Sequence, residues 1–149
     1  MSGYSWSEIE DAVVAALSPV LGERVKTLRP YQGDWREDLK QETWRLPAVL
    51  VRLGGTRAAA VGPGAYEVSL ELTVLVLNRD LRPPEGRRGQ EGTYALGALI
   101  RQALWHQDLG RELLPLALAE ERTLLGPPEY EVHSLTFRTG WLETPGTEG

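Results

Sequence analysis

The sequence predicts an α+β domain in which a mostly antiparallel sheet of about four to five strands is flanked by two main helices. Residues 66–76 alternate between apolar and polar side chains, which is the pattern of a half-buried strand. Residues 6–20 and 93–105 instead place apolar side chains at helical spacing. Glycine- and proline-containing segments separate further apolar stretches, which favours strands joined as hairpins.

The composition is that of an ordinary globular protein. The chain has 149 residues, 42% of them hydrophobic and 25% charged, so we expect one domain over residues 1–143 and a disordered tail over residues 144–149. The absence of cysteine excludes disulfides, thiolate nucleophiles and sulfur-ligated metals. A net charge of −5 argues against the broad basic face of a dedicated nucleic-acid-binding protein.

The sequence gives no sign of a membrane or export segment. No apolar run reaches the roughly 18 residues of a membrane span. The N-terminus has neither a basic region nor an apolar signal core. We therefore expect a cytoplasmic protein with no membrane partner.

The first helix has clear start and stop signals. Ser5 and Glu8 have the spacing of a capping box, in which each side chain accepts from the backbone of the other residue. Pro19 predicts a kink or an early end, and Gly22 suits a left-handed stop. The apolar stripe comprises Trp6, Ile9, Val13, Ala16, Leu17 and Val20.

Shorter elements follow the first helix. Residues 24–29 alternate and are predicted as an edge strand ended by Pro30, while residues 32–46 are expected to form a short helix or an ordered loop. Residues 48–53 are a compact apolar strand. The glycine-rich residues 54–64 are predicted to be a flexible connection whose flanking strands form a hairpin.

The alternating strand changes character along its length. Its polar face, which carries Glu67, Ser69, Glu71 and Thr73, becomes apolar at Leu75 and Leu77. One end should therefore face water, and the other should be covered on both sides by a helix or a neighbouring subunit.

An arginine-rich loop follows, from residue 79 to residue 92. Its arginines are Arg79, Arg82, Arg87 and Arg88, set against Asp80, Glu85 and Glu91. One reading is a solvated connection with compensating acids. The other is that the guanidinium groups reach acidic groups of a partner protein or DNA phosphates, since both suit their fork geometry.

The second helix is expected to begin with Thr93 as its N-cap and to be apolar on two opposite sides. Its core side comprises Leu96, Leu99, Ile100, Ala103 and Leu104. The second stripe comprises Tyr94, Ala98, Arg101 and Trp105. We predict that this second stripe is a subunit interface, because aromatic and arginine residues are enriched at interface centres. The alternative is partial burial of Tyr94 and Trp105 under the C-terminal segment of the same chain.

Two further strands are predicted at residues 116–125 and 130–142.

The sequence carries no recognisable catalytic or metal-binding motif. His106 and His133 belong to no spaced ligand pair that would join Asp108 or Glu131 at a metal. Glu120 and Glu121 are adjacent on a strand, so they point to opposite faces and cannot share one site without a bulge. No nucleophile elbow or phosphate-binding loop occurs. We therefore expect no catalytic residues, no metal and no cofactor.

Several segments carry a family resemblance. They are residues 9–17, Leu21, Gly22, Val25, Thr27, Leu28, Pro30, Tyr31, residues 46–51, the loop with Arg87, Arg88 and Gly89, and residues 94–96. Together they resemble the Mu-type phage tail proteins called gp37-like, from Ile9 to about Phe137. The resemblance implies a tail terminator, or tail completion protein, of a contractile-tailed phage, prophage or tail-like particle.

The resemblance also implies partners. Proteins of this kind assemble as a six-fold ring on the tail tube, stop polymerisation of tube and sheath, and offer a surface to the head–tail connector. On that view the second stripe is the ring interface, and the arginine loop faces the tube, a neighbouring subunit or the lumen through which DNA passes. The negative charge agrees with transient DNA contact, because affinity rises with each neutralised phosphate. Alternatives are a small host adaptor domain and an enzyme with an unrecognised site.

Overall fold

The computed structural model describes residues 5–79 and 92–145. Its elements in chain order are α1 (Trp6–Leu21), η1 (Gly22–Arg24), β1 (Thr27–Pro30), α2 (Trp35–Lys40), β2 (Ala48–Gly62), β3 (Ala65–Arg79), α4 (Thr93–Leu104), β4 (Ala117–Leu124) and β5 (Tyr130–Glu143). The predicted α+β class, with a mostly antiparallel sheet, is confirmed. Arg82, Arg87 and Arg88 of the predicted loop, and residues 146–149 of the predicted tail, lie outside the described residues.

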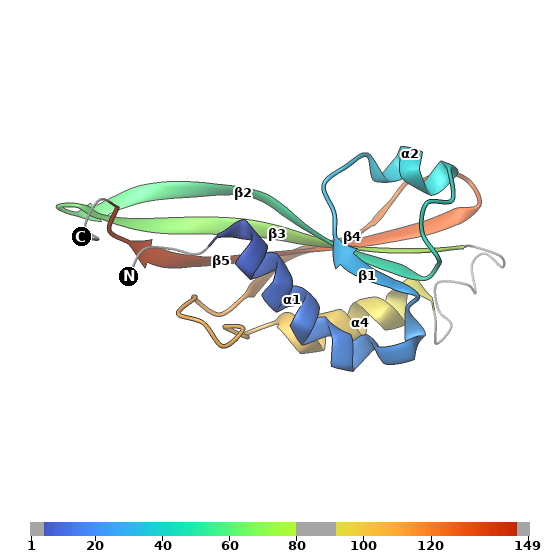
Figure 1. The fold of residues 1–149 in the computed structure, drawn as a ribbon, viewed down its shortest axis with the longest axis horizontal. Helices are drawn as coiled ribbons and strands as arrows, with labels where there is room; N and C mark the ends of the chain where they lie inside the picture. Colours follow the sequence, from blue (N-terminus) through green and yellow to red (C-terminus); the bar gives the residue numbers. More distant parts are fainter. Residues whose placement is uncertain (1–4, 80–91, 146–149) are drawn as a thin grey trace.

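One five-stranded sheet organises the molecule, with strand order β1-β2-β3-β5-β4. Among the described strands, β1 and β2 run parallel, and each other neighbouring pair is antiparallel. The three central strands are long, and part of their length extends past the helices as an arm (Figure 1). The arm comprises residues 54–62 and the residues that pair along them, 65–71 and 138–143. At its base, Val68, Leu70 and Trp141 still belong to the main core under the helices.

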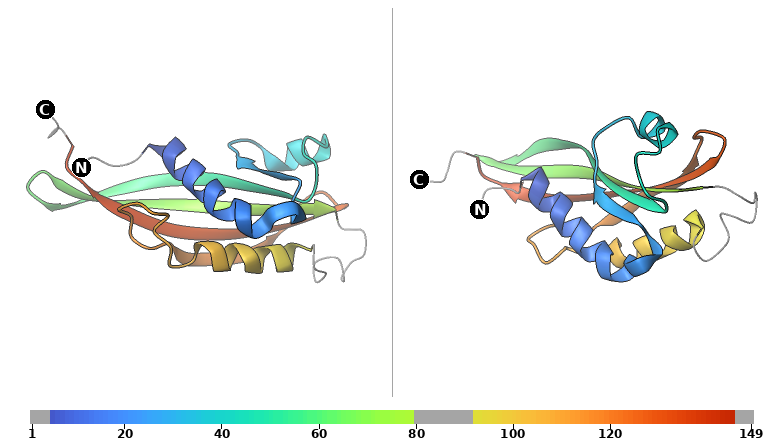
Figure 2. Two further views of the ribbon diagram at one scale, coloured as in Figure 1. Left: turned by 60° about the horizontal axis from the view of Figure 1, so that its bottom comes forward. Right: turned by 45° about the vertical axis from the view of Figure 1, so that its right-hand side comes forward.

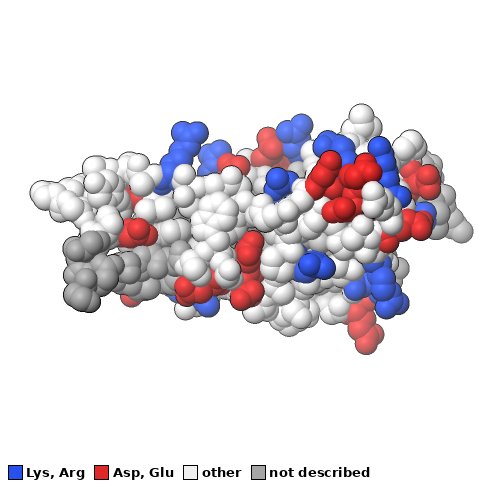
Figure 3. Space-filling model, turned by 45° about the horizontal axis from the view of Figure 1, so that its top comes forward, with Lys and Arg blue, Asp and Glu red and all other residues white. Residues whose placement is uncertain are grey.

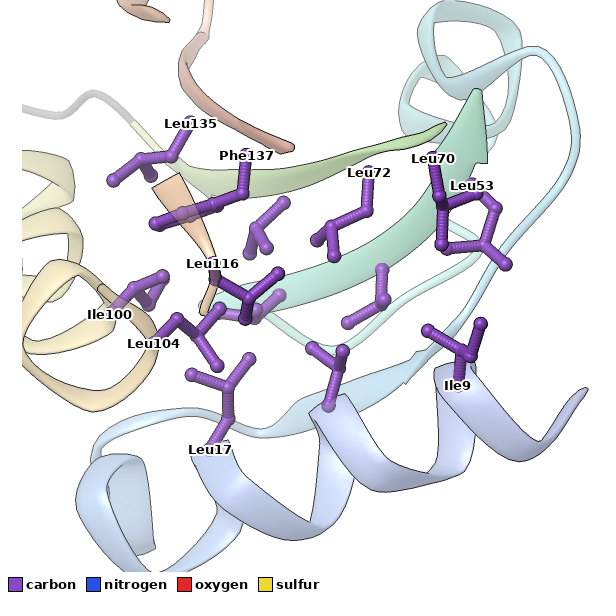
Figure 4. Packing of buried hydrophobic residues seen from close by; sticks show 14 of the residues in the cluster. Ile9, Leu17, Leu53, Leu70, Leu72, Ile100, Leu104, Leu116, Leu135 and Phe137 are labelled. Atoms are coloured by element: carbon purple, nitrogen blue, oxygen red, sulfur yellow. The ribbon is translucent and has the colours of Figure 1, made fainter. Parts of the chain in front are cut away.

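The main core lies between the sheet and the helices α1 and α4. Both helices lie on the same face of the sheet, and they contact each other (Figure 2). Ile9 and Leu17 of α1 and Ile100 and Leu104 of α4 point toward the sheet, whose Leu72 and Phe137 belong to the same cluster (Figure 4). Each of these side chains is inaccessible to solvent. Burial of each contributes roughly 1.5–3 kcal/mol, so this packing fixes how α4 is presented.

A second core lies on the opposite face, at one end of the sheet. Trp35 and Leu39 of α2 pack there against Leu50, Leu75 and Leu77. The predicted two-sided cover at Leu75 and Leu77 is thus supplied by a helix of the same chain. Among residues 5–79 and 92–145, no other helix covers this face, and positive and negative side chains intermingle on it (Figure 3).

The first helix has the predicted start. The Ser5 hydroxyl accepts from the Glu8 amide, and Glu8 Oε1 accepts from the Ser5 amide, both at 3.1 Å. Pro19 does not end the helix early, because it lies in the last turn and α1 continues to Leu21. Gly22 follows the helix with φ of 54° and ψ of −132°, so it has the positive φ that favours glycine but not the left-handed helical conformation that was predicted.

Two strand predictions are wrong in their extent. The segment predicted as a flexible connection is strand as far as Gly62, because its backbone pairs with β3 from Gly55 to Gly62. An irregularity between Leu53 and Gly55 accommodates one glycine, so the glycines bend the strand rather than end it. The first strand is β1, Thr27–Pro30, rather than residues 24–29, because residues 22–24 form the 3₁₀ turn η1. As predicted, it lies at a sheet edge.

Candidate subunit interface

The second stripe lies on the surface of the chain, with Tyr94, Ala98 and Arg101 in α4 and Trp105 at its C-cap, because the helix ends at Leu104. Tyr94 is 48% exposed and Trp105 is 36% exposed, and Ala98 and Arg101 are exposed between them. In the opposite stripe, Leu96, Ile100 and Leu104 are inaccessible to solvent, while Leu99 and Ala103 are half-buried. The helix is therefore anchored by one stripe and leaves the other open to solvent.

Part of the stripe is hollowed. A shallow groove of about 360 Å³ is lined by Ala98, Leu99, Arg101, Gln102 and Trp105. The Arg101 guanidinium lies 5.6 Å from the centre of the Trp105 ring, and that ring stacks on His106 with centroids 5.4 Å apart. An aromatic wall with a cation over it is a good anchor for a partner surface.

Polar contacts tie this stripe to the neighbouring strands. Glu121 of β4 lies 2.7 Å from His133 Nε2 of β5 and 3.5 Å from Arg101 Nη1 of α4. The Tyr94 ring lies 5.7 Å from the His133 ring. The sequence does not predict this cluster, because its members come from three elements and no local spacing joins them. Its consequence is that the α4 stripe and the β4 edge form one continuous surface.

Room for the cluster comes from a glycine. A Cβ at Gly97 would lie 3.1 Å from His133 Cδ2 and 3.6 Å from Glu121 Oε2, closer to the imidazole than side chains normally pack. A glycine inside a helix costs roughly 0.5–1 kcal/mol relative to alanine. Here it lets the helix approach the imidazole and the carboxylate.

The start of α4 is also fixed from outside the helix. Its N-cap is Gly92 rather than the predicted Thr93, and Gly92 has no side chain to accept a hydrogen bond. Instead, the amide of Thr93 donates to Oε1 of the fully buried Glu131, at 3.1 Å. A carboxylate at this position also interacts favourably with the positive end of the helix dipole.

Comparison with known proteins identifies the family. Residues 5–142 match the sequence profile described as "Bacteriophage Mu, Gp37". This chain belongs to the bacteriophage Mu Gp37 family. None of the curated proteins compared with the sequence matches it.

The fold of this Gp37-family chain recurs in a solved particle. A chain from a structure described as "Virion of native gene transfer agent (GTA) particle" superposes with a TM-score of 0.57 at 17% identity. The similarity covers 93% of this chain and 98% of the other. At this identity the match shows a shared fold.

Only one arginine of the predicted loop is described. Arg79 lies 3.5 Å from Glu42 and 3.8 Å from Glu129, and its guanidinium lies 5.1 Å from the centre of the Tyr130 ring. The acids that it meets belong to its own chain, which agrees with the reading of compensated charges for this residue. Because Arg79 is partly exposed, each ion pair contributes at most about 1 kcal/mol.

The described residues contain no candidate metal centre: nowhere in 5–79 or 92–145 do three or more histidine or acidic side chains gather. His133 contacts Glu121, and His106 stacks on Trp105. Glu120 pairs across the sheet with Thr136 and Glu121 with Leu135, so the two carboxylates lie on opposite faces, as expected. Among the described helices, none has both the length and the apolar character of a membrane span.

Proposed function

We propose that this chain is a structural protein of a phage tail or tail-like particle, and specifically a tail terminator. In this role it forms a closed ring on the tail tube, stops polymerisation of tube and sheath, and offers a surface to the head–tail connector. It performs no catalysis. The observation that carries the ring is the two-sided helix α4, whose exposed stripe holds two aromatic side chains and an arginine.

Two further observations support a particle component. The family is one of bacteriophage proteins, and the similar fold occurs in a chain of a virion structure. The described surface also lacks a clustered set of histidine and acidic side chains that would suggest metal-assisted chemistry. A ring subunit needs partner surfaces rather than an active site.

The proposed partners are a second copy of the chain, the tube and sheath proteins, and the head–tail connector. Contact with DNA is transient, because a conduit with a net charge of −5 per subunit does not retain phosphates. The proposed location is the cytoplasm of the bacterial host before assembly and the particle afterwards. Arg82, Arg87 and Arg88 are proposed to face the tube, the neighbouring subunit or the lumen.

Sedimentation velocity over a wide concentration range tests the ring. We expect a discrete closed species of several subunits with no open-ended growth. A strict monomer at the highest concentration would contradict spontaneous ring formation by the free chain.

Paired variants test the interface. Tyr94→Glu and Trp105→Glu should abolish association while the circular dichroism spectrum and melting temperature stay close to those of the wild type. The matched control is Trp6→Glu, because Trp6 is a similarly exposed tryptophan, at 41%, on the other helix. Association that survives both α4 variants, or unfolding of both, would overturn the assignment of this stripe.

A further inference from the structure

The sheet has two open edges, one at each side. β1 pairs with β2 only as far as Val51, and Gln32 bonds to Leu53; within residues 5–79 and 92–145, the part of β2 after Leu53 pairs with β3 alone. β4 is the outermost strand on the other side. We propose that the open edge of β2 in one copy pairs with β4 of the next copy, so that the sheet continues from subunit to subunit. This inference rests on the proposed ring and names the surfaces that form it.

Two bonded carbonyls of β2 show which of its later backbone groups point away from β3. The carbonyls of Val51 and Leu53 point to the open side, where they accept from the Tyr31 amide at 2.9 Å and from Gln32 Nε2 at 3.2 Å. Their partners on β3 are Val74 and Leu72. Along an antiparallel ladder, the N–H and C=O groups of successive residues point alternately toward and away from the partner strand. The later β2 residues whose groups point away from β3 are therefore those opposite Leu70, Val68 and Tyr66. These residues are Thr56, Ala58 and Ala60.

The same alternation identifies the open groups of β4. Val74 and Leu72 of β3 direct their backbone groups away from β2 and toward β5. Their partners on β5, Leu135 and Phe137, therefore form their backbone hydrogen bonds with β3. The intervening residues Ser134 and Thr136 therefore bond to Arg122 and Glu120 of β4. The N–H and C=O groups of Glu121 and Thr123 therefore point outward from the sheet. They can pair with the outward C=O and N–H groups of the β2 edge.

The side chains of the β2 edge fit the surface beside β4. Ala58 is opposite Val68, a member of the main core, so its side chain lies on the helix face of the sheet. A strand added to β4 at the usual spacing of about 4.8 Å, with its faces matched, brings Ala58 and Ala60 below the exposed stripe of α4. Because the side chains of Ala58 and Ala60 are small, they leave room for the Trp105 ring that lines the groove of the next copy. The arm edge and the α4 stripe thus become halves of one contact.

The β2 edge also lacks the usual protection against pairing. Between Gly54 and Gly62 it has no lysine and no proline, and Ala58, Ala59 and Ala60 are all exposed. Irregularities bracket this stretch, but Gly55–Ala60 pairs regularly with β3. An exposed, regular and nearly uncharged edge of this kind is a template for another strand.

The charges of the two edges are of opposite sign. Arg57 is the one charged residue between Gly54 and Gly62, and β4 carries Glu120, Glu121 and Arg122. Arg57 lies opposite Ser69 and Glu120 opposite Thr136, which places both side chains on the face away from α1 and α4. Because the two edges are different surfaces, pairing is head-to-tail, and such a contact gives a ring when its rotation closes.

Cysteine cross-linking tests this pairing, since the natural chain has no cysteine. Thr123→Cys is mixed with each of Thr56→Cys, Ala58→Cys and Ala60→Cys, and disulfide-linked heterodimers are quantified. The matched controls are Arg57→Cys and Ala59→Cys, whose side chains lie on the opposite face of the same strand. We expect the best partner among residues 56, 58 and 60 to cross-link at least about tenfold faster than either control, because disulfides require close, facing Cβ atoms.

A second variant examines the backbone contact. Ala58→Pro removes an outward N–H that the chain's own sheet does not use, so it should abolish association and leave the fold intact. A closed ring without the facing cross-links, or one unaffected by Ala58→Pro, would overturn the edge pairing and leave the terminator proposal standing. Facing cross-links within a species that grows without limit would support the pairing and contradict the closed ring. Absence of both cross-link and ring would overturn both.

Discussion

At the scale of single residues, Glu131 links the sheet to α4. Its carboxylate is fully buried and accepts from the first helical amide, so it replaces the side-chain cap that Gly92 lacks. We expect Glu131→Ala to lower the free energy of unfolding by about 1–3 kcal/mol, because the Thr93 amide loses its partner. Urea denaturation measures this change.

A neighbouring glutamate provides the control for that measurement. Glu129 has a side chain that is 73% exposed and forms a 3.8 Å ion pair with Arg79. Glu129→Ala should change stability by no more than about 0.5 kcal/mol, as expected for a surface site. Equal effects of the two substitutions would show that the cap contributes nothing specific.

The capping box of α1 makes stability depend on pH. Hydrogen bonds from the backbone and hydroxyl of Ser5 lower the pKa of the Glu8 carboxyl. A carboxyl whose pKa is lower in the folded state stabilises the fold above its unfolded-state pKa, and this contribution is lost as pH falls through the folded-state value. Glu8→Gln should therefore lower the melting temperature near neutral pH and approach the wild type in acid. A difference that stays constant with pH would contradict this origin.

At the scale of elements, α2 decides how far the sheet is covered on its second face. Leu39 is 2% exposed and packs in the cluster that contains Leu50, Leu75 and Leu77. We expect Leu39→Ala to cost about 2–5 kcal/mol, the range for truncating a buried leucine. Chemical denaturation provides the value, and Leu125→Ala, at a side chain that is 88% exposed, is the control with little expected change.

The elements also show what local patterns can predict. The start of α1, the two-sided α4 and the β2–β3 hairpin were predictable, because capping and periodicity are properties of neighbouring residues. The length of β2 was not, because glycines 54 and 55 suggest a turn and only pairing with β3 keeps them in a strand. The cap from Glu131 and the link between Glu121 and His133 were equally hidden, since they join residues far apart in the chain. Whether the exposed α4 stripe is an interface stays a prediction.

At the scale of the whole molecule, the sheet has a well-packed half and a thinly covered half. Leu50 lies in the half where α1 and α4 cover one face and α2 the other, and it is inaccessible to solvent. Arg57 and Ala59 lie on the same strand in the arm, where their side chains are exposed. Local opening is favoured where few apolar contacts are lost, so the two halves should differ in stability although one ladder joins them.

Hydrogen exchange of the monomeric chain measures this difference. By the alternation along β3, the amides of Leu50, Arg57 and Ala59 all point toward β3, so the comparison is between bonded amides of one strand. We expect Arg57 and Ala59 to exchange at least about a hundredfold faster than Leu50, because they open without global unfolding. Uniform exchange along β2 would instead show that the arm unfolds only together with the body. On association, the outward amide of Ala58 should become protected, since an unpaired N–H gains a partner only from another copy.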